Sequence, residues 1–465
     1  MKSQLFYVLL LFSTVTLAQN KESKLPPTPV SFHPITMDIT TCISDEQRQA
    51  VLQDIKANRQ IILDNNPDAF QQRTTTHPLF TLPLRPKDGF EDYGYYSLFN
   101  QVDHDPVANG NLLDYNCGER TYDWVSGNHG GTDYVVWPYP WKKMDDDVME
   151  VIAAAPGVII QKEDGNFDRN CTNNGNPNWN GIILEHADGS QTWYWHFKSG
   201  AITNKNVGDS VAQGEYLGGA GSSGSSDIPH LHFEVFDANG DRIDPYAGPC
   251  NSMNTETWWA EQPDYFIPEI LTLSTHNSDN FDTDCGITEN TYEELNFLPN
   301  ETIRFRIFYR DLQTDARTHI TVTKPDDSIL YDYNFDSTWP DYTAAWAEWN
   351  FPVESSWMDG VYTITAEFGG NTYETIFGVN TNLGLEDLQQ AEIKLYPNPT
   401  NNRISLDAPF QIDAVQIYDL MGRKVIDVTP LAEKSEMDLS HLTLGIYMAV
   451  ISFEGKQLVK KIVKE

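Results

Sequence analysis

The hydrophobic positions of this chain recur with two different periods, and the change of period divides the sequence. In residues 44–65, the apolar residues Val51, Ile55 and Ile62 recur at helical spacing. Ser44 with Gln47 forms a capping-box pattern at the start of this segment. From about residue 82 onward, short apolar runs of β character take over. The pattern predicts one long helix near the N-terminus, followed by a mainly β protein.

Three stretches of short apolar runs follow the helix, with turn residues between the runs. They cover residues 82–262, 263–380 and 392–465, and a polar linker at residues 381–391 precedes the last stretch. Regular short strands of this kind are typical of antiparallel sheets and sandwiches. The expected fold class is therefore mainly β: an antiparallel sheet domain followed by two β-sandwich modules, with one N-terminal helix. The predicted strands include residues 151–155, 158–161, 181–186, 192–197, 215–218, 230–236, 302–309, 318–324, 344–351, 360–368, 414–418, 446–453 and 458–463.

The first 18 residues have the parts of a secretory signal peptide. Lys2 supplies the positive end, residues 5–17 form a short apolar run, and Ala18 ends a small-residue cleavage site. The run is too short to span a bilayer comfortably, and no later segment has the apolar length of a transmembrane helix. We therefore expect an exported, soluble mature protein that begins near Gln19. Residues 19–81 are expected to form a leader or pro-segment.

Composition excludes some partners and fits a multidomain protein. Hydrophobic residues make up 40% of the 465 positions, which is enough for two or three packed cores. The formal net charge is −36, from 67 acidic and 31 basic residues. Phosphate binding depends on clustered Lys and Arg, so nucleic acid is not an expected partner of this surface.

Five cysteines occur in the sequence, and none belongs to a CxxC pattern that would indicate a cysteine-bound zinc. An exported protein meets oxidising conditions, so we expect disulfides. The sequence does not fix their pairing. Our prediction joins Cys117 to Cys171 and Cys250 to Cys285, which leaves Cys42 single.

His230-Leu231-His232 is the strongest chemical signal in the chain. Residues two apart in a strand point to the same face, so both imidazoles are expected on one side. Leu231 and Phe233 then face the opposite side and can be buried. Two such histidines can serve one metal site, one as a ligand and one beside the bound water. An isolated HxH pair also occurs by chance.

A second pattern, His129-Gly130-Gly131-Thr132-Asp133, adds a histidine and a carboxylate. Both are ordinary zinc ligands, and three protein ligands with an open position make a catalytic zinc site. The adjacent glycines argue against a helix, so we expect a tight loop that brings His129 and Asp133 inward. The alternative is a Gly-rich turn with a surface histidine.

His196 completes the candidate set. It lies in Tyr194-Trp195-His196-Phe197, where a strand would place Tyr194 and His196 on one face. A single strand histidine can equally be a packed or solvated residue. His186 is interpreted in that structural sense.

In this order, the three patterns resemble the motifs of the lysostaphin-like metallopeptidases, a family of glycyl-glycine and peptidoglycan endopeptidases. The family's HxxxD, YxH and HLHFE motifs are matched by His129 with Asp133, by Tyr194 with His196, and by residues 230–234. The likeness covers about residues 128–246, with further similar segments at residues 206–211, 218–224 and 244–246.

The resemblance implies a Zn²⁺ site on His129, Asp133 and His232, with His196 and His230 as catalytic residues beside it. Zinc can lower the pKa of its water and polarise a carbonyl. A neutral imidazole nearby can take the proton of the water, and a protonated one can hold the oxyanion. Which of the two histidines takes which role is left open.

Two long loops depart from the family pattern, at residues 134–144 and 164–179. They contain Trp137, Trp141 and Trp179, which could stack on a sugar or a peptide. Ordinary loop packing is the alternative for all three. Such loops usually border the groove in this fold, so substrate preference stays open.

The C-terminal module carries a second resemblance, to the sorting domain of type IX secretion. The similar segments are YPNPT at residues 396–400, residues 415–422, residues 444–447 and the basic tail at residues 460–464. The resemblance implies that the type IX secretion machinery carries the protein from the periplasm through the outer membrane. The protein would then be secreted or attached to the cell surface, usually without this domain. The alternative is a plain β-sandwich module.

The leading functional hypothesis is a secreted zinc metalloendopeptidase that hydrolyses peptides of bacterial cell-wall peptidoglycan. A second version of the enzyme would cleave Gly-rich proteins instead. A metal-free relative that only binds the wall, or a surface adhesin built on residues 263–379, would be a non-catalytic protein. Wall digestion and zinc content distinguish the enzyme from these binding modules.

Overall fold

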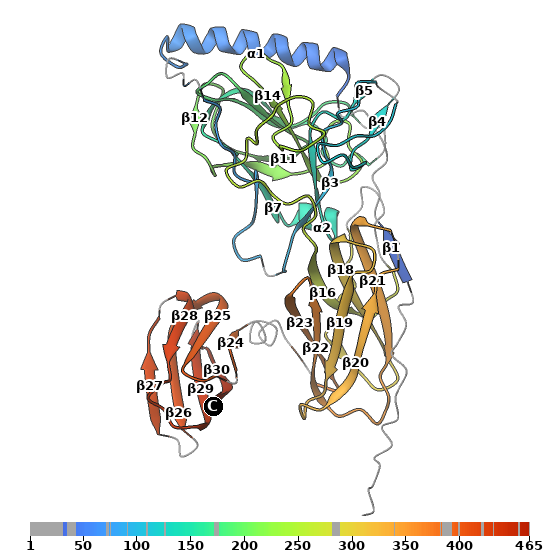
Figure 1. Cartoon of the computed structure of the whole chain (residues 1–465), viewed down its shortest axis with the longest axis vertical. Helices are drawn as coiled ribbons and strands as arrows, with labels where there is room; N and C mark the ends of the chain where they lie inside the picture. The colour runs from blue at the N-terminus through green and yellow to red at the C-terminus, as the bar shows by residue number, and fades with distance from the viewer. Residues whose placement is uncertain are drawn as a thin grey trace, which may run out of the picture.

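The computed structural model describes residues 31–34, 43–70, 74, 76–90, 92–107, 110–124, 127–171, 176–280, 289–338, 340–381, 383, 393–398, 400–419, 423–430, 432–453 and 456–464. Within these ranges the chain forms three β modules and two helices (Figure 1). The mainly β fold class, with an N-terminal helix, is confirmed. No helix in the described part is long and apolar enough to cross a membrane. The predicted signal peptide lies outside the described residues.

Helix α1 (Asp45–Asn65) is the helix that the apolar spacing predicts. Ser44 caps it by accepting a hydrogen bond from the Gln47 backbone, and the Gln47 side chain accepts one from Ser44. Its apolar face, with Val51 and Ile55, packs against the first β module. Figure 1 shows α1 lying across the end of this module that is distant from the other two.

The first β module has a large and a small antiparallel sheet, with the short helix α2 (Pro140–Asp145) between β6 and β7. Its strands are β2 (Leu84–Pro86), β3 (Tyr96–Asn100), β4 (Asp123–Trp124), β5 (Gly127–Asn128), β6 (Thr132–Val136), β7 (Met149–Ile152), β8 (Gly157–Glu163), β9 (Gly181–Glu185), β10 (Gln191–Trp195), β11 (Phe197–Ile202), β12 (Ser210–Val211), β13 (Tyr216–Ala220), β14 (His230–Phe236) and β15 (Arg242–Ile243).

The large sheet has the order β12-β8-β9-β10-β14-β6-β3, with β15 beside β14, and the small sheet has the order β11-β13-β7-β2. One face of the large sheet contributes Ile182, Tyr194 and Leu231 to the main core of the module. The opposite face carries Ile183 and Trp193, which pack against α1. This alternation follows from the two-residue period of a strand.

The second module is a sandwich of two sheets. Its strands are β16 (Glu269–His276), β17 (Asn296–Phe297), β18 (Thr302–Leu312), β19 (Arg317–Thr323), β20 (Ile329–Asp336), β21 (Tyr342–Pro352), β22 (Gly360–Phe368) and β23 (Asn371–Val379). The sheets have the orders β1-β21-β18-β16 and β17-β23-β22-β19-β20. The edge strand β1 (Ser31–Pro34) precedes α1 in the sequence and pairs antiparallel with β21. The segment before the first module therefore contacts both modules, β1 the second and α1 the first (Figure 1).

The first two modules share an apolar interface. Phe99, Trp137 and Tyr139 of the first module pack against Phe308 and Trp346 of the second. The Trp137 indole also donates a hydrogen bond of 3.2 Å to the Tyr309 carbonyl. A buried aromatic side chain contributes ~1.5–3 kcal/mol to stability, so this contact joins the two modules firmly.

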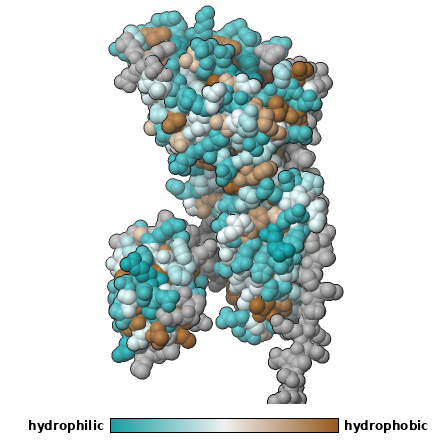
Figure 2. Space-filling model, viewed as in Figure 1, coloured by the Kyte–Doolittle hydropathy of each residue, from teal (hydrophilic) through white to brown (hydrophobic). Residues whose placement is uncertain are grey.

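The C-terminal module is a smaller sandwich, with sheet orders β24-β25-β28 and β27-β26-β29-β30. Its strands are β24 (Lys394–Tyr396), β25 (Arg403–Ile412), β26 (Ala414–Asp419), β27 (Lys424–Val428), β28 (Ala432–Asp438), β29 (Gly445–Phe453) and β30 (Lys456–Lys464). It has a separate core, which includes Ile417 and Ile451. The face of the whole molecule in Figure 2 is mostly hydrophilic, with apolar residues in small groups.

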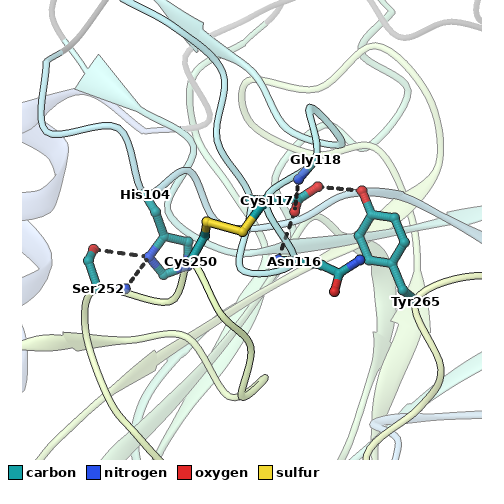
Figure 3. The surroundings of a disulfide bond; sticks show 8 residues. His104, Asn116, Cys117, Gly118, Cys250, Ser252 and Tyr265 are labelled. Carbon is teal, nitrogen blue, oxygen red and sulfur yellow. Dashed lines mark hydrogen bonds between the residues drawn. A yellow bond between two sulfur atoms is a disulfide. The ribbon is translucent and has the colours of Figure 1, made fainter.

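The predicted disulfide pairing is wrong. Cys117 bonds to Cys250, with the two Cα atoms 5.1 Å apart, because the fold brings these distant loops together (Figure 3). Asp114 supports the Cys117 loop by accepting hydrogen bonds from the backbone of Asn116 and Gly118. Cys171 is also disulfide-bonded. Cys42 and Cys285 both fall outside them.

Candidate metal centre

Strands β6 and β14 bring together two of the three predicted metal ligands. They pair antiparallel with His232 directly opposite Asp133. Leu231 and Phe233 point into the main core, so His230 and His232 share the other face, as the HxH spacing predicts. His232 Nδ1 lies 2.8 Å from Asp133 Oδ1.

The third predicted ligand, His129, enters through the glycine loop between β5 and β6. A Cβ atom at Gly131 would lie 2.7 Å from the Phe233 carbonyl oxygen and 2.8 Å from the His232 ring, so a side chain would not fit there. The close approach lets His129 Nε2 come within 3.0 Å of Asp133 Oδ2. It also lies 3.2 Å from His232 Nδ1. The expected inward bend of this loop is therefore observed.

The spacing of the three side chains suits a tetrahedral metal ion, whose ligands at about 2.0–2.1 Å lie roughly 3.3 Å from one another. His129 Nε2 lies 3.2 Å from His232 Nδ1, and the two rings lie 3.0 and 2.8 Å from different oxygens of Asp133. His129 Nδ1 donates to the Gln101 carbonyl at 2.6 Å, and His232 Nε2 donates to Glu234 Oε1 at 3.1 Å. In neutral imidazoles the facing nitrogens then both present lone pairs. A cation between them suits this donor set.

The electrostatics of the centre also favour an ionised carboxylate. Burial alone would raise the pKa of Asp133, but His129 and His232 in their protonated form outweigh burial and hold the pKa well below its usual range. All three side chains are at most 2% exposed. His129, Asp133 and His232 form the one His/Asp/Glu/Cys group with metal-ligand spacing among the described residues.

His196 and His230 lie beside the three ligands, with their ring centroids 4.4 Å apart. His196 Nδ1 donates to the Ser223 carbonyl at 2.6 Å, and His230 Nδ1 donates to the Ile228 carbonyl at 2.8 Å. In the neutral tautomer each ring therefore has its lone pair at Nε2. His230 Nε2 lies 3.8 Å from Asp133 Oδ1.

The predicted shared face of Tyr194 and His196 is wrong. The predicted strand 192–197 ends at Trp195, and His196 has a left-handed backbone with φ 66°. Tyr194 points into the main core, where its hydroxyl accepts a hydrogen bond from the Ala154 backbone. The break at His196 turns its ring to the opposite side, next to His230. The YxH pattern thus selects a histidine that lies beside the candidate centre, although the shared strand face does not place it there.

The remaining candidates make contacts within the protein. His186 Nδ1 donates to the Pro156 carbonyl at 2.8 Å and its Nε2 lies 3.0 Å from the Thr192 hydroxyl, as the structural interpretation expects. Trp137 is buried in the interface between modules, so the loop-packing alternative holds and stacking on a substrate is excluded for it. Trp141 is buried as well, and Trp179 packs against Trp195.

Two charged residues at the centre were not among the candidates. Glu234 lies on the same face of β14 as His232, and the two-residue spacing could have identified it. Both oxygens of Glu234 accept hydrogen bonds of 2.9 Å from Arg48 of α1. Arg48 lies 186 residues away in sequence and has no local signal.

Comparison with known proteins defines the class of two of the modules. Residues 143–245 match peptidase family M23, and residues 394–465 match the secretion system C-terminal sorting domain. The chain therefore contains a lysostaphin-like M23 peptidase domain and a sorting domain of type IX secretion. The M23 match includes His196, His230 and His232 but begins after His129 and Asp133. The sorting domain indicates that the protein is secreted or held at the cell surface.

Individual relatives match only parts of the chain. The cell division protein DipM of Caulobacter vibrioides is 43% identical over 54 residues, which is 12% of this chain and 8% of that protein. A mutant catalytic domain of the prophage-encoded M23 protein EnpA from Enterococcus faecalis is 20% identical, with a TM-score of 0.22, and covers 36% of this chain and 94% of that one. A putative peptidase M23 from Pseudomonas aeruginosa is 19% identical, with a TM-score of 0.20, over 40% and 59%.

Proposed function

We propose that the protein is an exported zinc-dependent endopeptidase that cleaves peptide bonds in bacterial cell-wall peptidoglycan. The observation that supports this most directly is the convergence of His129, Asp133 and His232, each of which offers a ligand atom within 4.8 Å of those of the other two. The M23 match supports the peptidase class. The wall substrate rests on the family resemblance and on the short match to a cell division protein.

In this proposal His129, Asp133 and His232 hold the metal. Bound zinc would lower the pKa of a bound water molecule and polarise the carbonyl of the peptide bond to be cleaved. His196 and His230 each use Nδ1 as a donor to a backbone carbonyl, so Nε2 is the atom that moves protons. A neutral ring can accept the proton of the attacking water at Nε2. A protonated ring can donate to the oxyanion or to the leaving amine.

Access to this centre requires a change in the full chain. The five site side chains are all at most 2% exposed, so a polymeric substrate does not reach them in this state. We propose that residues 19–81 act as a pro-segment, that residues 82–262 are the catalytic unit, and that the sorting module is removed on export. Peptide mapping of exported protein tests the processing. Intact Lys464-Glu465 on most exported molecules would contradict removal of the sorting module.

The decisive experiment measures zinc content and wall digestion on the same purified protein, before and after cleavage of the leader. We expect about one zinc per chain, and release of wall peptides that a chelator stops and added zinc restores. A Gly-rich polypeptide serves as the comparison substrate. A leader-cleaved, zinc-loaded chain that leaves peptidoglycan intact would refute the proposed substrate, and a chain without zinc would refute the mechanism.

A further inference from the structure

Glu234 links the metal centre to the leader helix. It is 1% exposed and lies on the face of β14 that carries His232. One carboxylate oxygen, Oε1, accepts the hydrogen of His232 Nε2 at 3.1 Å. A histidine that uses one nitrogen for a metal commonly donates its other N–H to a carboxylate, which fixes the tautomer and the orientation of the ring.

The buried carboxylate of Glu234 is held in turn by two arginines. Arg48 contacts both oxygens in a two-pronged ion pair, at 2.9 Å each, and its guanidinium lies 5.5 Å from the centre of the Trp193 ring. Arg242 Nη2 is more distant, at 3.7 Å. Its guanidinium lies against Gly130 of the metal-ligand loop, where a Cβ would be only 2.6 Å away. A buried carboxylate needs such partners, and removing one is costly.

Arg48 belongs to α1, outside the part of the chain that matches the peptidase family. The same helix makes a second ion pair with the large sheet, between Arg59 and Glu185. Glu185 is buried like Glu234. Among the described residues, no hydrogen bond or ion pair connects Glu185 to His129, Asp133 or His232. Arg48 and Arg59 are therefore a matched pair, because both form an ion pair between α1 and the large sheet. Only the ion pair of Arg48 involves a carboxylate that contacts a candidate metal ligand.

We propose that Glu234 is a positioning residue for His232, and that Arg48 of the leader helix holds Glu234 in place. The leader then raises the metal affinity of the peptidase domain in the full chain through a chain of three contacting side chains. This inference rests on the proposed function, because it requires His232 to be a metal ligand.

The test measures zinc affinity of the full chain by competition with a chelating dye, and needs no activity assay. Glu234→Ala removes the acceptor of His232 and is expected to weaken zinc binding about 10–100-fold. Glu234→Gln keeps one acceptor oxygen and is expected to fall between Glu234→Ala and the unmodified chain. Arg48→Gln is expected to weaken zinc binding by a smaller factor. Arg59→Gln removes the matched ion pair and is expected to leave zinc affinity unchanged.

The outcomes separate this inference from the proposed function. An unmodified chain that binds no zinc overturns the proposed function itself. Zinc affinity in Glu234→Gln and Glu234→Ala equal to that of the unmodified chain overturns the positioning role. Equal affinity in Arg48→Gln and Arg59→Gln overturns the role of the leader. Circular dichroism on each metal-free variant confirms folding, and Glu234→Gln keeps the test valid where Glu234→Ala does not fold.

Discussion

Among the described residues, the first β module contains two buried histidine–carboxylate groups, and only one of them has the donor arrangement that suits a metal ion. In the second group, His104 Nε2 donates to Asp244 at 2.8 Å. His104 Nδ1 accepts from the Ser252 backbone at 3.2 Å, as Figure 3 shows. Asp244 also accepts from the Tyr246 backbone at 2.9 Å. Each donor meets an acceptor, so this group is a closed structural network.

The candidate metal centre differs because its acceptor atoms face one another. His129 Nε2, His232 Nδ1 and the Asp133 carboxylate converge, and the ring hydrogens point outward to Gln101 and Glu234. The pKa values follow the same division. Burial raises the pKa of Asp244, with His104 opposing it only partly, whereas two histidines hold the pKa of Asp133 well below its usual range. Burial and residue type are therefore similar in the two groups. The feature that distinguishes the candidate metal centre is that the imidazole N–H groups of His129 and His232 point away from it.

The largest expected effect comes from removing a ligand. His232→Ala, His129→Ala and Asp133→Ala should each lose zinc and reduce wall digestion to background, because three protein ligands are needed to hold a catalytic metal. Metal analysis and a wall-digestion assay on the leader-cleaved protein measure both losses. His104→Ala is the control from the second group and should keep its zinc. Activity that survives in His129→Ala after exhaustive chelation would contradict the zinc mechanism.

A smaller effect is expected for the two flanking histidines. His196→Ala and His230→Ala should keep the metal, because neither is assigned as a ligand, and should lose ~10²–10⁴ in rate through the missing proton transfer. The ratio of zinc content to activity distinguishes them from the ligand variants. A modest loss of zinc affinity in His230→Ala is compatible with its position near Asp133. An empty His230→Ala beside a fully loaded His232→Ala would reverse the assignment.

Local patterns predicted the elements that depend on local rules. The capping pair Ser44 and Gln47 and the apolar spacing located α1, and the alternation of polar and apolar residues gave β14 with its end residues. The HxH and HxxxD residues meet because β6 and β14 are neighbours. The sequence could suggest that pairing only through the family resemblance.

The misses involve contacts between distant segments. The left-handed backbone at His196 accompanies a hydrogen bond to Ser223, 27 residues away, and no local pattern indicates it. The Cys117–Cys250 bond joins loops 133 residues apart. Arg48 contacts Glu234 only because α1 packs against the large sheet of the first module. In each case the three-dimensional fold, and not local propensity, selects the partner.

The His104→Ala variant tests whether the second histidine–carboxylate group contributes to stability and not to metal binding. Its loss removes the donor to Asp244, which is fully buried, and a buried acceptor without a partner costs about 1–3 kcal/mol. We expect a lower midpoint of thermal unfolding with an unchanged zinc content. Loss of zinc in a folded His104→Ala would show that the two groups are coupled and would remove the distinction between them.

The smallest expected effect is a difference in acid stability between Asp133→Asn and Asp244→Asn, measured as urea unfolding midpoints of the metal-free chain. The pKa of Asp133 is below the ordinary value of 3.8 in the folded chain, so its ionised form contributes stability that is present above pH 3.8 and lost as the pH falls further. The pKa of Asp244 is above 3.8, so its protonated form contributes stability that is present below pH 3.8 and lost as the pH rises through the folded pKa. The stability difference between the unmodified chain and Asp133→Asn should therefore shrink as the pH drops below 3.8.

The corresponding difference for Asp244→Asn should shrink as the pH rises above 3.8. A pH dependence of the same sign in both variants would mean that the two carboxylates have the same electrostatic environment, against the geometry of the two groups.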